Sequence, residues 1–111
     1  MKQKPDLPQG TLDLLVLKAL SLGETHGYGV GLRIAQLADD MLRVEEGTLY
    51  PALYRIEQMG WIDSKWGISE NNRRARFYRL TRAGLKQLGI EGERWDHITA
   101  AVAKVMRATT A

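Results

Sequence analysis

The segment Lys65–Arg82 holds six cationic side chains and a single carboxylate, that of Glu70. Its cations are Lys65, Arg73, Arg74, Arg76, Arg79 and Arg82. Six positive charges against one negative charge give the segment +5, whereas the whole chain carries +3. Arginine suits phosphate because its planar guanidinium donates two parallel hydrogen bonds. The cluster predicts contact with a polyanion such as a nucleic acid, and a solvated hairpin is the alternative.

A second group of side chains that can bind nucleic acid precedes this cluster: Thr48, Tyr50, Pro51, Tyr54 and Arg55. They lie on the polar side of a predicted helix, and residues near the start of such a helix reach base edges in the major groove. Three alternatives stay open: Thr48 caps the helix, Tyr54 packs against the hairpin, or Arg55 pairs with a carboxylate. No arginine or asparagine at the helix start is placed to read a base, which favours phosphate and shape readout.

The chain offers little for catalysis. Its two histidines, His26 and His97, have no second metal ligand at a suitable spacing, and the chain contains no cysteine. It shows no recognisable nucleophile motif and no phosphate-cradling loop. We therefore expect no enzyme activity, no catalytic residue, no metal site and no cofactor.

Apolar residues at helical spacing predict two helices in the first part of the chain. The first helix follows Gly10, with Thr11 as its cap and Gly23 as its end. The second covers Tyr28–Ala38, after a turn at Glu24–Gly27. Its apolar stripe comprises Val30, Ile34, Leu37 and Ala38.

A third helix is predicted to begin near Gly47 or Thr48 and to end at Gly60, since glycine favours a C-terminal stop. Pro51 is expected in its first turn, where a missing N–H has no intrahelical partner to lose. The core face of this helix is expected to comprise Leu49, Leu53, Ile56 and Met59.

Two strands follow at Trp61–Trp66 and Ala75–Leu80, joined by the polar loop Gly67–Arg74. Three helices followed by a basic hairpin predict a mainly α (α+β) fold: a winged helix-turn-helix with a two-stranded wing. Arg73 and Arg74 are expected to contact the DNA backbone or a narrow minor groove.

Three further polar residues of the hairpin bear on the same contact. Asn71 and Asn72 either contact phosphate or form the turn, and their residue type favours the turn. Arg76 completes the expected set of DNA-binding residues in the wing. Lys2 and Lys4 form a short basic arm that can touch phosphate, although a frayed terminus is the favoured interpretation.

A last helix is predicted over Arg82–Arg107, capped by Thr81. Its apolar stripe has heptad spacing and comprises Leu88, Trp95, Ile98, Val102 and Val105. So short a chain has no further element to cover the stripe, which therefore predicts a homodimer through this helix. Gly89 and Gly92 are expected to kink or soften it.

Trp95 has a second interpretation besides filling the dimer interface. Two copies facing each other across a twofold axis can stack on a flat aromatic ligand. Trp95, Ile98 and Val102 are therefore the candidate ligand and dimer residues. Trp61 and Trp66 are instead expected to pack at the base of the wing.

The chain divides by function into residues 1–81, which bind DNA, and residues 82–111, which dimerise. Met1–Gly10 lacks the apolar core of a signal peptide. No apolar run approaches the roughly 20 residues that span a bilayer. We therefore expect a cytoplasmic protein with no membrane partner.

The sequence resembles the PadR-like transcriptional regulators, in particular short members with a single C-terminal helix. The resemblance rests on GTLDLLVLKAL (Gly10–Leu20), HGYGV (His26–Val30), GTLYPALYRIEQMGWI (Gly47–Ile62) and RFYRLTRAGLKQL (Arg76–Leu88). It implies a winged-helix homodimer that binds a palindromic operator, usually as a repressor. It also implies release from DNA by a small, often aromatic, effector.

Two other functions compete with this interpretation. A protein-interaction adaptor would reuse the winged fold without binding nucleic acid. RNA binding through the basic hairpin is the weaker alternative, because RNA recognition uses exposed aromatic side chains and the aromatic residues here fall mostly at expected interior positions.

Overall fold

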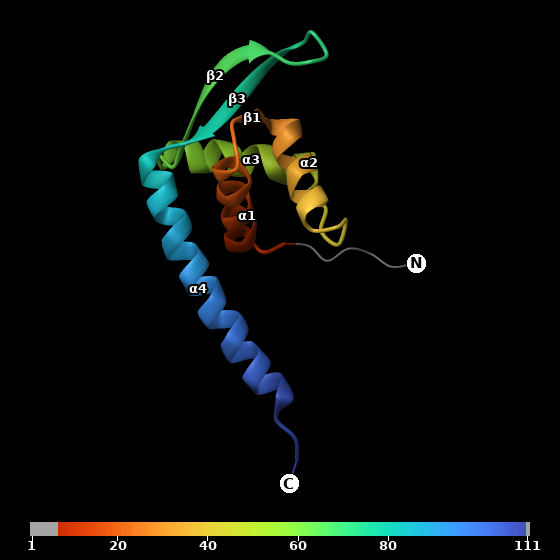
Figure 1. Cartoon of the computed structure of the whole chain (residues 1–111), viewed down its shortest axis with the longest axis vertical. Coiled ribbons are helices and arrows are strands. Elements are labelled where there is room, and N and C mark those ends of the chain that lie inside the picture. The colour runs from red at the N-terminus through yellow and green to blue at the C-terminus, as the bar shows by residue number, and fades with distance from the viewer. Residues whose placement is uncertain (1–6, 111) are drawn as a thin grey trace.

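The computed structural model describes residues 7–110, which form four α-helices and three β-strands (Figure 1). In chain order they are α1 (Gln9–Ser21), β1 (Thr25–His26), α2 (Gly27–Leu37), α3 (Glu46–Gln58), β2 (Ile62–Ile68), β3 (Arg74–Leu80) and α4 (Arg82–Arg107). The arrangement is the predicted winged helix-turn-helix, with β2 and β3 forming the wing. Among the described residues no helix has both the length and the apolar character needed to cross a bilayer. The basic arm predicted at Lys2 and Lys4 lies outside this range.

α1 is the centre of the core, and α2, α3, α4 and β3 all pack against it. Its buried side chains are Leu12, Val16, Leu17, Ala19 and Leu20. The helix begins before the predicted cap, because the N–H of Leu12 donates to the carbonyl of Pro8 (3.0 Å). Thr11 therefore lies inside the first turn, and its predicted capping role is wrong.

α2 contributes Val30 and Ile34 to the core, as predicted. Leu37 is exposed instead of buried, because the helix ends at this residue. The chain then turns through Asp39 and Asp40, whose φ angles of 50° and 61° lie in the left-handed region. The core face of α2 is thus one turn shorter than its apolar pattern indicates.

α3 buries Leu49, Leu53 and Ile56 as predicted, and also Ala52. Met59 is exposed because it follows the last turn of the helix and caps it. The predicted stop at Gly60 is confirmed by its φ of 78°, which glycine adopts without strain.

Pro51 lies deeper inside α3 than predicted. The helix begins at Glu46, so Pro51 occupies the second turn instead of the first. Its missing N–H leaves the carbonyl of Gly47 without its intrahelical donor. Gly47 is exposed, so water can satisfy that carbonyl.

The sheet has three antiparallel strands in the order β1-β3-β2, one more than the predicted hairpin. The segment expected to be only a turn contains β1, in which Thr25 pairs with Tyr78 and His26 pairs with Phe77. β1 fastens the wing to the start of α2.

α4 starts at the predicted position, where Oγ1 of Thr81 accepts a hydrogen bond from the N–H of Gly84 (3.0 Å). It runs as one continuous helix through Gly89 and Gly92 to Arg107. The helix leaves the body of the molecule and extends away from it (Figure 1).

Candidate nucleic-acid interface

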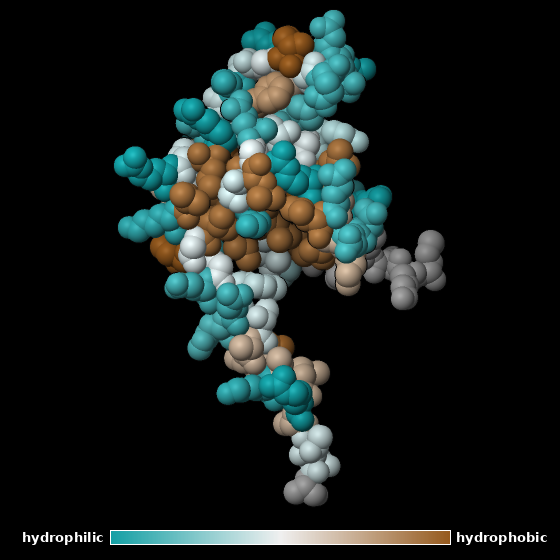
Figure 2. Space-filling view, in the orientation of Figure 1, coloured by the Kyte–Doolittle hydropathy of each residue, from teal (hydrophilic) through white to brown (hydrophobic). Residues whose placement is uncertain are grey.

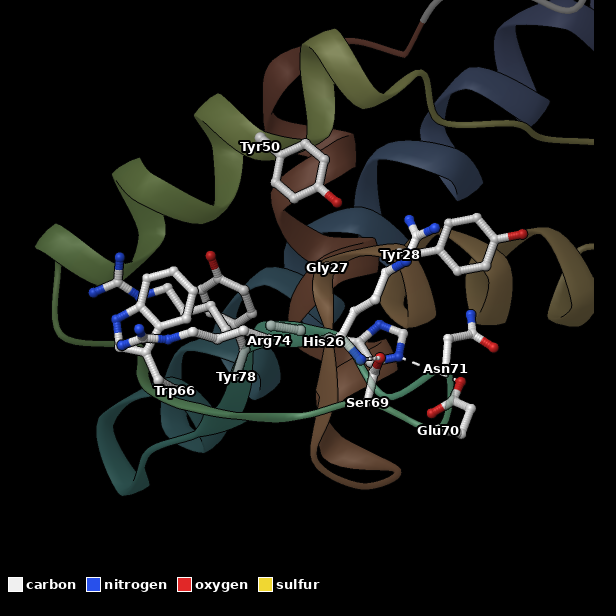
Figure 3. Close-up of a pocket in the computed structure, with 13 residues that line it drawn as sticks. His26, Gly27, Tyr28, Tyr50, Trp66, Ser69, Glu70, Asn71, Arg74 and Tyr78 are labelled. Atoms are coloured by element: carbon white, nitrogen blue, oxygen red, sulfur yellow. Dashed lines mark hydrogen bonds and ion pairs between the residues drawn. The ribbon is translucent and has the colours of Figure 1, made fainter.

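A groove of about 660 Å³ separates the wing from the starts of α2 and α3 (Figure 3). Its lining residues are His26, Gly27, Tyr28, Tyr50, Trp66, Ser69, Glu70, Asn71, Arg73, Arg74, Ala75, Arg76 and Tyr78. The sequence predicts Tyr50 on one DNA-binding element, the third helix, and Arg73, Arg74 and Arg76 on another, the wing. The structure brings them around one hollow.

The register of the wing explains why the arginines face this groove. Trp66 on β2 pairs directly with Arg76 on β3. Arg74 lies two residues before Arg76 and therefore shares its face of the sheet. The Cζ atoms of Arg74 and Arg76 lie 4.7 and 5.4 Å from the centroid of the Trp66 ring.

A short hydrogen-bond chain ties this face of the wing to α3. Nε of Arg76 donates to Oγ of Ser64 (2.8 Å), and that hydroxyl donates to Oε2 of Glu57 (2.6 Å). Because the chain uses only Nε, the terminal nitrogens of Arg76 remain available to a ligand.

The opposite face of the wing carries cations too, but these are paired. Nε of Arg79 donates to Oδ1 of Asp63 (2.7 Å), and Nζ of Lys65 lies 3.5 Å from Oε1 of Glu24. No carboxylate within residues 7–110 forms an ion pair with Arg73, Arg74 or Arg76. The free positive charge of the wing is therefore concentrated on the groove side and at the tip.

The predicted DNA-binding residues of α3 are exposed with one exception. Thr48, Tyr50, Pro51 and Tyr54 all lie on the surface. Tyr54 is 67% exposed, so it does not pack in the core against the wing. The capping alternative for Thr48 is also wrong, because Glu45 occupies the N-cap position and no side chain caps the helix.

Arg55 is the exception, since it forms an ion pair with Asp13 of α1. Both side chains are largely withdrawn from solvent. Burial raises the pKa of Asp13, while the hydrogen bond and charge of Arg55 act in the opposite direction. The salt-bridge alternative therefore describes Arg55, and we leave it out of the proposed DNA-binding surface.

Tyr50 reaches the groove because Gly27 has no side chain. A Cβ atom on Gly27 would lie 2.5 Å from Cε1 of Tyr50, so any other residue would displace the ring. Burial, with a smaller contribution from Glu46, raises the pKa of Tyr50. At neutral pH its phenol is uncharged and can donate a hydrogen bond to a phosphate.

His26 joins the start of α2 to the tip of the wing. Its Nδ1 accepts a hydrogen bond from the N–H of Gly29 (3.0 Å) and so caps the helix. The proton must then reside on Nε2, which lies 3.5 Å from Oε1 of Glu70. Hydrogen bonds from the backbone N–H of Glu70 and from His26 lower the pKa of Glu70. The histidine ring also meets Phe77 edge-on, with 5.4 Å between the ring centroids.

Replacing His26 with alanine is expected to lower the free energy of unfolding by about 1–2 kcal/mol, because α2 loses its cap and Phe77 loses an aromatic neighbour. Urea denaturation followed by circular dichroism measures this change. His26→Asn is the matched control, since asparagine caps a helix but cannot contact Phe77 in the same way. An alanine variant as stable as the wild type would contradict the capping role.

Asn72 forms the turn of the wing, the favoured alternative for this residue. Its φ of 57° is left-handed, a conformation that asparagine tolerates. Its N–H donates to the carbonyl of Ser69 (2.9 Å). Neither fact assigns it a DNA contact.

The apolar stripe of α4 is exposed in the single chain. Trp95, Ile98 and Val102 are 41%, 48% and 53% exposed, and Val105 is more exposed still. Only Leu88, nearest the body, packs against the core. Figure 2 shows a broad apolar area on the body of the molecule as well. Apolar surface is therefore exposed both on the body and on α4.

Three residues of the groove are not among the DNA-binding residues that the sequence predicts: Tyr28, Trp66 and Glu70. Tyr28 lies two residues after the capping His26, and it is exposed at the groove. The signal for Trp66 was the hairpin register, because a loop at Ser69–Arg73 places Trp66 opposite Arg76. The predicted loop, Gly67–Arg74, is longer than the observed one, so the sequence alone does not show that Trp66 pairs with Arg76.

Comparison with known proteins finds similarity to transcriptional regulators. The sequence model described as "Transcriptional regulator PadR-like family" matches residues 16–90. A solved transcriptional regulator from Clostridium thermocellum is 31% identical, with 86% of this chain and 93% of that chain covered and a TM-score of 0.78. A PadR family transcriptional regulator from Eggerthella lenta is 31% identical, with coverage of 91% and 86% and a TM-score of 0.76. One from Clostridium difficile is 27% identical, with coverage of 86% and 97% and a TM-score of 0.72.

Proposed function

This chain belongs to the PadR-like family of transcriptional regulators, and we propose that it binds double-stranded DNA through α3 and the groove face of the wing. The observation that carries the proposal is the placement of Arg74 and Arg76 beside the exposed side of α3, without carboxylate partners in residues 7–110. In a winged helix-turn-helix, α3 enters the major groove and the wing follows the adjacent backbone. Tyr50 and the arginines then face the same strand of phosphates.

Selection of bound fragments from random duplex DNA tests this proposal. A dimer is expected to select an inverted repeat whose half-sites are spaced by about one helical turn or a multiple of it. The logarithm of the affinity for the selected site should fall linearly with the logarithm of the salt concentration. The slope should be about −0.9 for each phosphate contacted. A protein that binds no duplex even in dilute buffer would contradict the proposal.

The chain divides, in this proposal, into a DNA-binding part at residues 1–81 and a dimerisation helix at residues 82–111. The exposed stripe on α4 supports a homodimer, because most of the stability of an amphipathic helix comes from packing its apolar face against another surface. A second copy of α4 offers the same stripe at the same spacing. Twofold symmetry would then present two α3 helices to a palindromic operator.

Replacing Trp95 with alanine and Val102 with aspartate in one variant is expected to convert the dimer to a monomer at micromolar concentration, because the change removes an anchor and buries a charge. Sedimentation velocity measures the assembly state. Ala100→Asp is the control, since it adds the same charge on the opposite side of α4. A double variant that stays dimeric would exclude the stripe as the interface.

Repression and control by an effector complete the proposal. A bound dimer at an operator would act as a repressor in the cytoplasm, where it meets DNA. Trp95 at the proposed interface can stack with its copy on a small aromatic compound, and binding there would change the angle between the two DNA-binding parts. Titration of the dimer with flat aromatic compounds, followed by tryptophan emission, tests this step: quenching is expected in the wild type and should be lost in Trp95→Phe.

A further inference from the structure

Trp66 lies on the wing in a place where core packing does not explain it. Its side chain is 56% exposed, although burial of a large aromatic ring is strongly favourable. Trp61, at the base of the wing, is by contrast half-buried and packs against the core. The sequence predicts that both tryptophans pack at the wing base, and only Trp61 does so.

The exposed ring of Trp66 is in contact with two cations. Arg76 pairs with it across the strands, and Arg74 lies on the diagonal, so both guanidinium groups reach the same ring. The attraction is electrostatic, between a cation and the negative face of the indole. Tryptophan is the best of the aromatic residues for this contact.

The two faces of the wing hold their arginines by different chemistry. Arg79 is held by the carboxylate of Asp63, which occupies its N–H groups and cancels its charge. A guanidinium held over the Trp66 ring keeps its positive charge, and its terminal N–H groups stay available. Arg76 is held in addition through Nε, which donates to Oγ of Ser64 (2.8 Å). An aromatic ring can therefore hold an arginine without neutralising it, whereas a paired carboxylate cancels the charge that would attract phosphate.

We propose that Trp66 is a positioning residue that holds Arg74 and Arg76 towards the groove, ready to bind the phosphates of a DNA duplex. Long arginine side chains lose rotamer freedom when they bind, and a preformed stack removes part of that loss. The inference rests on the proposed DNA-binding function. It assigns Trp66 no contact with DNA of its own.

Substitution of Trp66 by phenylalanine and by leucine tests the role of the ring. Leucine keeps apolar bulk but has no ring, and it is expected to weaken binding to a selected duplex by about 5- to 30-fold. Phenylalanine should lose less than leucine. The slope of log affinity against log salt should stay unchanged in both variants, because the two cations are still present. Ile68→Ala is the matched control, since Ile68 is an exposed apolar residue of β2 paired with Arg74.

Two further measurements separate positioning from a structural role. In a chain that already carries Arg74→Ala and Arg76→Ala, Trp66→Leu is expected to have no further effect on affinity. In the free protein, NMR signals of the Arg74 and Arg76 side-chain N–H groups should show ring-current shifts that persist in Trp66→Phe and disappear in Trp66→Leu. This second measurement needs no DNA.

The outcomes distinguish this inference from the proposed function. Wild-type protein that ignores duplex DNA would overturn the proposed function. Wild-type protein that binds, with Trp66→Leu binding equally well, would overturn only the inference. An undiminished effect of Trp66→Leu in the chain without the two arginines would also overturn it, as would loss of the salt slope in Trp66→Leu alone.

Discussion

Replacing Arg74 and Arg76 together with alanine is expected to lower the slope of log affinity against log salt by about two per protomer, and hence by about four for a dimer. Binding to a selected operator should weaken by about 100-fold or more, because charge-assisted hydrogen bonds contribute about 1.5–3 kcal/mol each. Both arginines are exposed and without carboxylate partners in residues 7–110, so their removal should leave the fold intact. Fluorescence anisotropy on a labelled duplex over a series of salt concentrations measures both quantities.

Arg79→Ala is the matched control for this pair. It removes the same residue type from the same strand, but from the opposite face, where Asp63 already neutralises it. Its effect on the salt slope should be small. If Arg79→Ala lowers the slope as much as the loss of an arginine from the groove face, the proposed orientation of the wing on DNA is wrong.

Replacing Gly84 with alanine is expected to destabilise the fold by about 3 kcal/mol, at the upper end of the range for overpacking. A Cβ atom on Gly84 would collide with the carbonyl oxygen of Trp61 and would lie 2.8 Å from Cδ1 of Leu80. The carbonyl cannot move aside easily, because it accepts a hydrogen bond from the N–H of Thr81 (3.0 Å). The free energy of unfolding from urea denaturation measures the loss.

Gly89→Ala, in the same helix, is expected to raise the free energy of unfolding instead of lowering it. A Cβ atom on Gly89 meets nothing within 4 Å, and alanine stabilises a helix interior by up to about 1 kcal/mol relative to glycine. The two variants are compared at one protein concentration, since dimerisation would contribute to stability. Equal stability of the two variants would show that Gly84 is not needed for the close approach of α4 to the wing.

The parts of the fold predicted correctly are those with local signals. The cap at Thr81, the stop at Gly60 and the helical periodicity of α1 and α4 each depend on residues close together in the chain. The basic segment was correctly placed on a hairpin for the same reason, because strand alternation is a property of consecutive residues. These local signals sufficed for the order of the four helices and the hairpin, and hence for the winged helix-turn-helix.

Some errors concern helix ends, where Thr11, Leu37 and Met59 were misplaced. The errors that matter for the site involve contacts between distant segments. β1 is only two residues long, which is too short to show a periodic pattern in the sequence. It pairs with β3 about fifty positions later in the chain, as Thr25 with Tyr78. The partner of Arg55 is Asp13 on another helix, which spacing within α3 could not indicate. The stack on Trp66 needed the register of the wing, and register depends on the loop boundaries.

A single residue, Thr81, makes the whole connection between β3 and α4. Its hydroxyl donates to the carbonyl of Gly60 (2.7 Å) while accepting from the N–H of Gly84, so the joint has no slack. In the proposed dimer, a change in the tilt of α4 would therefore move the wing as well. The distance between operator half-sites that the protein tolerates would then depend on the angle at which the two α4 helices cross.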